Sequence, residues 1–136
     1  MKAAGIDFGS VRIGLAVADD LGSLAHPRPF VDGRDRKRAL AALAEFAKSE
    51  NIEVFVLGLP RTLSGRESQS TRAARQFARQ IQKATGLPVE MVDEWLSTKQ
   101  ALDRLRDQGI NAKGAKSRVD SAAAAIILQS WLDGRR

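Results

Sequence analysis

Residues 5–19 read GIDFGSVRIGLAVAD, and this stretch decides how the fold begins. Apolar residues alternate with small or polar ones over residues 2–8 and again over residues 13–19, as in two half-buried strands. Residues 9–12 can supply the tight turn between them. The sequence therefore predicts an antiparallel hairpin, which forms the first two strands of a sheet.

An acidic residue, Asp7, interrupts the first of these strands. Alternation places Asp7 on the same strand face as Gly5 and Gly9, so these glycines are expected to clear space around the carboxylate. An isolated ionised carboxylate among apolar side chains costs several kcal/mol unless it is paired or binds a cation. Asp7 is therefore a candidate cation ligand. The alternative is a strand-end carboxylate that accepts hydrogen bonds from the amides of the following turn.

The elements after the hairpin alternate between strands and helices. Residues 24–31 could form a third strand, although their two prolines confine it to an edge of the sheet or interrupt it. The other expected elements are a helix over 34–49, a strand over 53–58, a loop over 59–69, a helix reaching about residue 85, a strand over 88–93, a helix over 97–108, a polar loop, and a helix over 119–132. This order predicts an α/β fold: a mixed five-stranded sheet, antiparallel at its start and then parallel, with helices on both faces.

Length and composition limit the class of protein. The 136 residues contain no repeats or linkers and fit one domain over residues 1–136. The sequence has no membrane-length apolar run, no secretory signal pattern and no cysteine, so we expect a cytoplasmic protein without a membrane partner. A net charge of +6 favours a polyanionic partner such as nucleic acid.

Two further acids lie at the ends of predicted elements. Glu94 follows the strand over residues 88–93, and Asp120 falls in the first turn of the last helix, which Ser117 could cap. Taken singly, Glu94 is explained by a solvated loop and Asp120 by attraction to a helix N-terminus. Together with Asp7 they fit a divalent-cation site. Oxygen ligands without cysteine favour Mg²⁺ or Mn²⁺ over zinc.

Basic residues supply candidate contacts to a polyanion. Arg12 lies in the hairpin turn, and Lys116 and Arg118 precede the acid of the last helix. A cluster over residues 34–38 lies at the start of the first helix, where positive charge opposes the helix dipole. Helical spacing aligns a further set along one face of the second helix: Arg72, Arg75, Arg79 and Lys83. For each set, a solvated surface is the alternative.

Four segments, in this order, resemble the conserved blocks of one family. They are GIDFGSVRIGLAVAD, VLGLPRTLSGRES, VDEWLST and RVDSAAAAIILQSW, and the resemblance covers nearly the whole chain. The family is YqgF, whose members are described as pre-16S ribosomal RNA nucleases and also as Holliday junction resolvases. The resemblance implies an RNase H-like nuclease domain and a hydrolase acting on the ester bonds of nucleic acid.

The resemblance also implies that Asp7, Glu94 and Asp120 form the acidic metal site of this nuclease, with Mg²⁺ or Mn²⁺ as its cofactor. The sequence departs from the family pattern at Trp95, which stands where the family usually has an arginine. A phosphate contact from that arginine is therefore not expected. Trp95 is explained by packing, and a stacking platform for a base is the alternative.

The expected function is processing of the 5′ end of precursor 16S ribosomal RNA, by a monomer or a homodimer. Resolution of branched DNA as a Holliday junction resolvase is the first alternative. A noncatalytic RNA-binding module of ribosome assembly is another, and it would keep the acids as structural caps. Finally, DFGSVRIGLAV resembles the phosphate-binding hairpin of actin-like kinases and ATPases, but those enzymes need two such domains to enclose a nucleotide.

Overall fold

The structure, a computed structural model, describes residues 2–60, 69–94 and 112–135, without the side chains of residues 60, 94 and 112–121. In chain order its elements are β1 Ala3–Asp7, β2 Arg12–Ala18, β3 Ala25–Asp32, α1 Arg36–Ser49, β4 Val54–Pro60, α2 Gln69–Thr85, β5 Val89–Glu94 and α4 Ala112–Gly134. None of the described helices is both long and apolar enough to cross a membrane.

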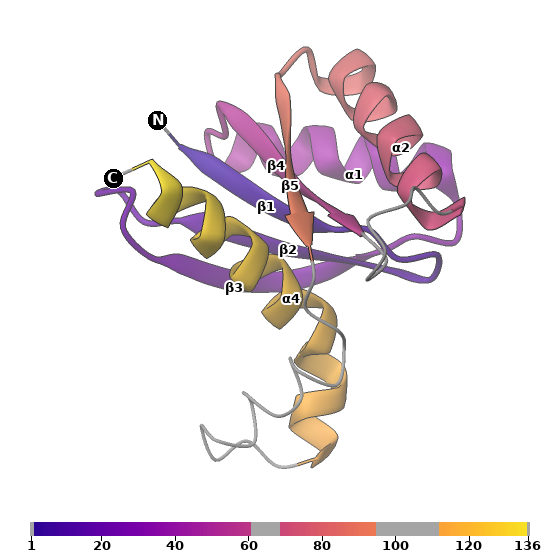
Figure 1. The fold of residues 1–136 in the computed structure, drawn as a ribbon. Helices are drawn as coiled ribbons and strands as arrows, with labels where there is room; N and C mark the ends of the chain where they lie inside the picture. Colours follow the sequence, from indigo (N-terminus) through magenta and orange to yellow (C-terminus); the bar gives the residue numbers. More distant parts are fainter. Residues whose placement is uncertain (1, 61–68, 95–111, 136) are drawn as a thin grey trace.

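The five strands form one sheet in the order β3-β2-β1-β4-β5 (Figure 1). β1 pairs with β2 and β2 pairs with β3, both antiparallel, whereas β1 pairs with β4 and β4 with β5 in parallel. The predicted mixed sheet with an antiparallel start is therefore confirmed. β3 lies at an edge and continues through both prolines, so of the two outcomes that the prolines left open, the edge position is the observed one.

Helices cover both faces of the sheet, as predicted (Figure 1). On one face, Ala4 and Ile6 of β1 belong to a core shared with α1 and α2. On the other, Ala3 of β1 belongs to a core shared with α4, which includes Ala124 and Leu128. Alternation along β1 then places Asp7 on the face that α4 covers.

The helix α4 lies unusually close to β1. A Cβ atom built on Gly5 would lie 2.6 Å from the carbonyl oxygen of Ala124 and 2.7 Å from Cβ of Leu128. Only glycine permits this approach. In Figure 1, β1 begins beside the end of α4, so the two elements run in opposite directions. Position 120, one helical turn before Ala124, therefore lies toward the Asp7 end of β1.

The start of α4 differs from the predicted one. The sequence predicts a helix from about residue 119, capped by Ser117 and preceded by a polar loop, but α4 already begins at Ala112. Asp120 is thus not in the first turn, so attraction to the helix N-terminus does not explain it, and Ser117 lies inside the helix and does not cap it. Alanine and lysine dominate residues 112–116, and their helix propensity outweighs the cost of one glycine. The apolar pattern marked only the later part of the helix.

One side chain of α4 fastens the helix to the β2–β3 connection. Gln129 donates through Nε2 to the carbonyl oxygen of Ser23 at 2.8 Å, and its Oε1 accepts from the backbone N–H of Ala25 at 2.9 Å. The N–H of Ser23 donates to Oδ1 of Asp19 at 2.8 Å, and this bond is the main reason that the pKa of Asp19 is lowered. These bonds hold the end of α4 against the edge of the sheet.

Gln129→Leu is expected to lower the free energy of unfolding by about 1–2 kcal/mol. The substitution keeps most of the side-chain volume but leaves two partly buried backbone groups without their partner. Urea denaturation measures the change, with Ser130→Ala, at an exposed neighbouring position, as the control. Equal stability of the parent and Gln129→Leu would contradict this account of how α4 is anchored.

Candidate active site

Asp7 is the last residue of β1 and is half-buried. Its nearest positions on the α4 face of the sheet are all glycines. Gly5 precedes it by two residues, Gly14 is its partner on β2, and Gly58 lies beside it on β4 when the parallel register is extended by one residue. No side chain of the neighbouring sheet positions therefore crowds the carboxylate. The sequence predicts the role of Gly5, but Gly14 and Gly58 are recognised only from the strand register.

Gly9 has a different role from the predicted one. A Cβ atom at this position would collide with the carbonyl oxygen of Arg12, so glycine is needed for the hairpin turn to close. The same turn is tied to the end of β3, because the N–H of Gly33 donates to the carbonyl oxygen of Val11 at 2.7 Å. Gly9 thus shapes the turn after Asp7 rather than the space around its carboxylate.

The backbone brings Glu94 and Asp120 to the same end of the molecule. Glu94 ends β5 two residues after Val92, which packs on the α4 side, so position 94 belongs to the α4-facing row of β5. Asp120 lies on α4 one helical turn before Ala124, toward the Asp7 end of β1. The side chains of Glu94 and Asp120 are outside the described set. Among the side chains that are described, no three His, Asp or Glu residues gather as a metal site.

A pocket of about 300 Å³ opens beside Asp7. It joins the ends of β1 and β4 to the first turns of α2. Its lining residues are Asp7, Phe8, Ser10, Gly58, Ser70, Ala73 and Ala74. In α/β sheets, ligands bind outside the carboxyl ends of parallel strands. The pocket therefore places small and polar groups next to the carboxylate at the end where a ligand is expected.

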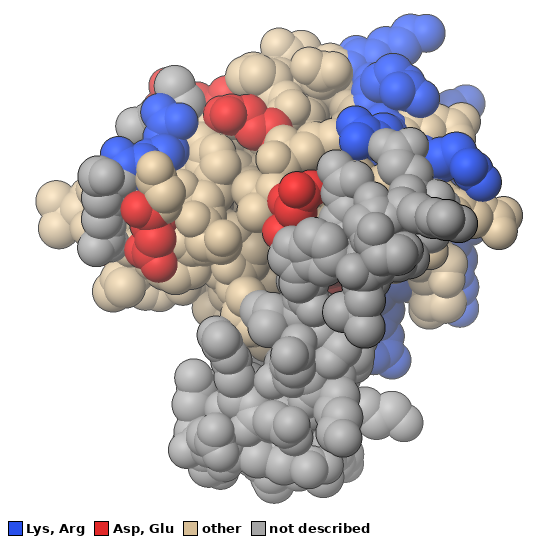
Figure 2. Space-filling model, viewed as in Figure 1, with Lys and Arg blue, Asp and Glu red and all other residues tan. Residues whose placement is uncertain are grey.

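The predicted basic stripe on α2 is an exposed surface. Arg72, Arg79 and Lys83 are exposed and Arg75 is half-buried. The buried side of the helix consists of Thr71, Ala74, Phe77, Ala78 and Ile81. Figure 2 shows Lys and Arg side chains gathered over the α2 side of the molecule. Because α2 begins at the pocket beside Asp7, the basic stripe runs along this helix away from Asp7.

The basic cluster over residues 34–38 makes contacts within the chain. Arg34 pairs with Asp32 at 2.7 Å, and the hydrogen bonds from Arg34 lower the pKa of Asp32 to about 2. Asp35 caps α1 by accepting from the N–H of Arg38 at 3.1 Å, which favours the helix start despite the basic residues around it. Contacts within the chain therefore account for Arg34 and Arg38 without a nucleic-acid partner.

Arg36, in the same cluster, joins α1 to α2. Its Nη1 donates to Oε1 of Gln80 at 2.6 Å. Its guanidinium carbon lies 5.0 Å from the ring centroids of both Phe8 and Phe77, whose rings stack at 4.4 Å. Arg36 thus covers the aromatic pair behind the pocket. Charge spacing alone contains no signal for this role, because Phe8 and Phe77 meet only in the fold.

Several predicted features fall outside the described residues. They are residues 61–68 of the predicted loop over residues 59–69, Trp95, and the predicted helix over residues 97–108. The side chains of Lys116 and Arg118 are also outside the described set, although both residues lie on α4. Arg12 is described: it begins β2 and is exposed, and its guanidinium carbon lies 5.0 Å from the ring centroid of Phe30.

Comparison with known proteins identifies the family. The family model described as "RuvX: Holliday junction resolvase" matches residues 1–134. The chain belongs to the RuvX family. Curated relatives of this RuvX-family chain are named "Putative pre-16S rRNA nuclease". This is the name expected from the resemblance to the YqgF family, so the resemblance is confirmed.

Two relatives illustrate the extent of the match. A protein of Anaeromyxobacter sp. (strain Fw109-5), named "Putative pre-16S rRNA nuclease", is 47% identical over 135 residues, covering 99% of this chain and 98% of the relative. A protein of the same name from Nitratidesulfovibrio vulgaris (strain DSM 19637 / Miyazaki F) is 40% identical, covering 98% of this chain and 94% of the relative. As a member of this nuclease family, the RuvX-family chain is a hydrolase acting on ester bonds.

Solved structures agree on the fold. RuvC of Thermus thermophilus, solved in complex with a Holliday junction substrate, superposes with a TM-score of 0.59 at 22% identity and covers 99% of this chain and 95% of its own. The fowlpox virus resolvase, in a complex with Holliday junction DNA, superposes with a TM-score of 0.63 at 12% identity and 99% coverage of each chain. At these identities the likeness concerns the fold alone, and the expected RNase H-like fold is confirmed.

Proposed function

We propose that this chain is a metal-dependent nuclease that processes the 5′ end of precursor 16S ribosomal RNA in the cytoplasm, with residues 1–136 as one nuclease domain. The observation that carries the proposal is the half-buried Asp7 carboxylate at the end of β1, with glycines at its neighbouring positions on the α4 face. The names of the relatives support the choice of substrate. The net charge of +6 suits a polyanion.

The donor set suits Mg²⁺ or Mn²⁺. Asp7, Glu94 and Asp120 would supply hard carboxylate oxygens, and the sequence offers no cysteine and one histidine, His26, on the edge strand β3. The glycines around Asp7 leave room for an ion that keeps part of its water shell. A bound divalent ion would polarise the phosphodiester and make a water molecule acidic enough to react at neutral pH.

The chain's own residues would hold and orient the substrate. Asp7, Glu94 and Asp120 come from β1, β5 and α4, so their carboxylates would approach the reacting group from three elements. Arg12, Lys116 and Arg118 would supply positive charge to the phosphate backbone and to the charge that develops in the transition state. The apolar core that Ala3 of β1 shares with Ala124 and Leu128 of α4 keeps the two elements in a fixed relation, which positioned catalysis requires.

Junction resolution is the second candidate, favoured by the description of the matching family model. A junction resolvase must cut two strands symmetrically and therefore acts as a dimer, whereas an RNA processor can act as a monomer. Cleavage of labelled precursor RNA and of four-way junction DNA, each with Mg²⁺ or Mn²⁺, would distinguish the two. Sedimentation with and without the junction would give the oligomeric state.

The outcomes of this experiment separate the alternatives. Metal-dependent cleavage of precursor RNA supports the proposal. Cleavage of the junction by a dimer, without cleavage of RNA, would replace it by the second candidate. RNA binding that survives Asp7→Asn, with no cleavage by the parent at any metal concentration, would instead indicate a noncatalytic module.

Replacing Arg72, Arg75 and Arg79 together by alanine is expected to weaken nucleic-acid binding and to flatten its salt dependence. Each phosphate that the protein no longer neutralises reduces the slope of log K against log salt concentration by about 0.7–0.9, so the slope of the triple variant should fall by about two units or more. Titrations at several salt concentrations measure the slope, with Lys48→Ala, in the last turn of α1, as a charge control. Unchanged binding would mean that the stripe is only a solvated surface.

A further inference from the structure

Phe30, on the edge strand β3, is an exposed aromatic side chain that belongs to neither apolar core of the described residues. Its relative exposure is 38%. The guanidinium carbon of Arg12 lies 5.0 Å from the centroid of its ring, within the range of a cation–π contact. Packing of the core therefore does not account for a phenylalanine at this position.

An extra residue in β3 turns Phe30 toward the face of the sheet that carries Asp7. The paired positions on either side are Ile13 with Val31 and Leu15 with Arg28. Two steps along β2 thus match three steps along β3, and Pro29 and Phe30 both lie opposite Gly14. Val31 packs on the α1 and α2 side, so the bulged pair lies on the α4 side. Bulges redirect side chains in this way and occur often beside active sites.

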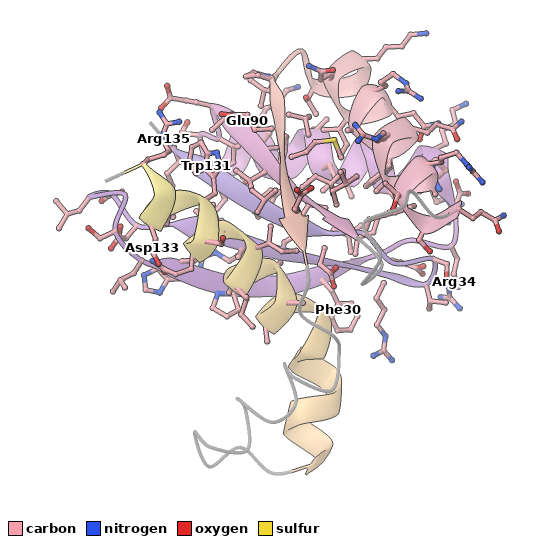
Figure 3. All side chains as sticks on the ribbon, in the orientation of Figure 1. Phe30, Arg34, Glu90, Trp131, Asp133 and Arg135 are labelled. Carbon is pink, nitrogen blue, oxygen red and sulfur yellow. The ribbon has the colours of Figure 1, made fainter. Side chains whose placement is uncertain are left out.

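The strand register sets Asp7 and Phe30 in one row across the sheet. Asp7 pairs with Gly14, and Gly14 lies opposite the bulge that contains Phe30. Two strand spacings, about 10 Å, separate the ends of this row. Because Gly14 has no side chain, the sheet puts no side chain between the carboxylate and the ring. Figure 3 shows Phe30 on the same side of α4 as the tip of β5.

The backbone holds the ring and Arg12 together. Arg12 pairs with Asp32, and the bond from the N–H of Gly33 to the carbonyl oxygen of Val11 closes the end of the hairpin over the same strands. Arg12 is itself exposed, so its guanidinium can contact a phosphate while the ring accepts a base. The pair is thus preorganised before any ligand binds, which lowers the entropic cost of binding.

We propose that Phe30, together with Arg12, is a stacking platform for an unpaired base of the nucleic-acid substrate, next to the phosphodiester held at Asp7. The inference rests on the proposed function for the identity of the ligand. Aromatic rings stack on any unpaired base and cannot reach one that is stacked within a duplex. The platform therefore selects single-stranded nucleotides beside the cleavage point.

The test measures binding of a labelled single-stranded RNA oligonucleotide in the presence of a chelator, so that no cleavage occurs. Phe30→Leu is expected to weaken binding by about 5- to 100-fold, and Phe30→Trp to retain it, because tryptophan stacks and leucine does not. Binding of duplex RNA should change little. Leu24→Ala serves as the control, since Leu24 is an exposed apolar residue just before β3, at the opposite end of the sheet.

A single abasic site, moved along the RNA one nucleotide at a time, gives the decisive readout. At one position the abasic site should weaken binding to the parent, and Phe30→Leu should add almost nothing further, because both changes remove the same stacking interaction. Parallel weakening at every position, or equal binding by the parent and Phe30→Leu, would overturn the platform. Cleavage that still depends on Asp7 would then leave the proposed function intact. Full cleavage by Asp7→Asn would overturn the function while the binding result stands.

Discussion

Asp7→Asn is expected to lower metal-dependent phosphodiester cleavage by about 10²- to 10³-fold or more. The amide keeps the shape of the side chain but carries no negative charge to hold a cation, and the transition state is then less stable by several kcal/mol. Glu94→Gln and Asp120→Asn should have effects of the same order if the three carboxylates share one ion. Cleavage of labelled precursor RNA and junction DNA at several Mg²⁺ or Mn²⁺ concentrations measures the decrease. Full cleavage by any variant would remove that residue from the site.

Stability measurements separate a shared metal site from three carboxylates that act independently of one another. If the carboxylates crowd together, neutralising one relieves their repulsion, so each variant should keep or slightly raise the melting temperature without metal. Each should also lose the rise in melting temperature that added metal produces in the parent. Asp93→Asn, which removes the same charge from an exposed neighbour of Glu94, should keep both properties. If adding Mg²⁺ or Mn²⁺ leaves the melting temperature of the parent protein unchanged, the shared metal site is contradicted.

Gly5→Ala is expected to lower the free energy of unfolding by about 1–3 kcal/mol, although it adds a single methyl group. The new Cβ would lie 2.6 Å from the carbonyl oxygen of Ala124 and 2.7 Å from Cβ of Leu128, and backbone cannot yield without moving α4. The melting temperature should fall by about 3–10 °C. Cleavage should also fall at temperatures where the variant is folded, because a shift of α4 would move Asp120 relative to Asp7.

The matched control for this prediction is Gly134→Ala. A Cβ atom at Gly134 meets no atom within 4 Å, and the residue lies at the end of the same helix. Alanine there should leave stability and cleavage unchanged or raise stability slightly, because it favours the helix. Circular dichroism melts of both variants compare the two sites directly. Equal stability of Gly5→Ala and the parent would mean that α4 is free to move away from β1.

The sequence by itself determined the antiparallel hairpin and the class of the fold, and it limited β3 to an edge of the sheet or an interruption. These features depend on short-range signals: alternation, the prolines 27 and 29, and the order of strands and helices along the chain. The family could also be recognised, because its four blocks are continuous segments. The start of α4 was predicted wrongly, because apolar periodicity marks where a helix packs and not where its hydrogen bonds begin.

Only the tertiary structure decided what surrounds Asp7. Gly58 is far from Asp7 in the chain and becomes its neighbour through a parallel pairing that no local pattern encodes. The partner of Asp7 across the hairpin, Gly14, is set by the strand register. The same holds for Phe30, whose face depends on one extra residue in β3 and reverses if the register slips by one. Composition and spacing could select acids, glycines and aromatics as candidates. Their distances depend on long-range register and on how closely α4 approaches Gly5, and these are set by packing of the whole sheet.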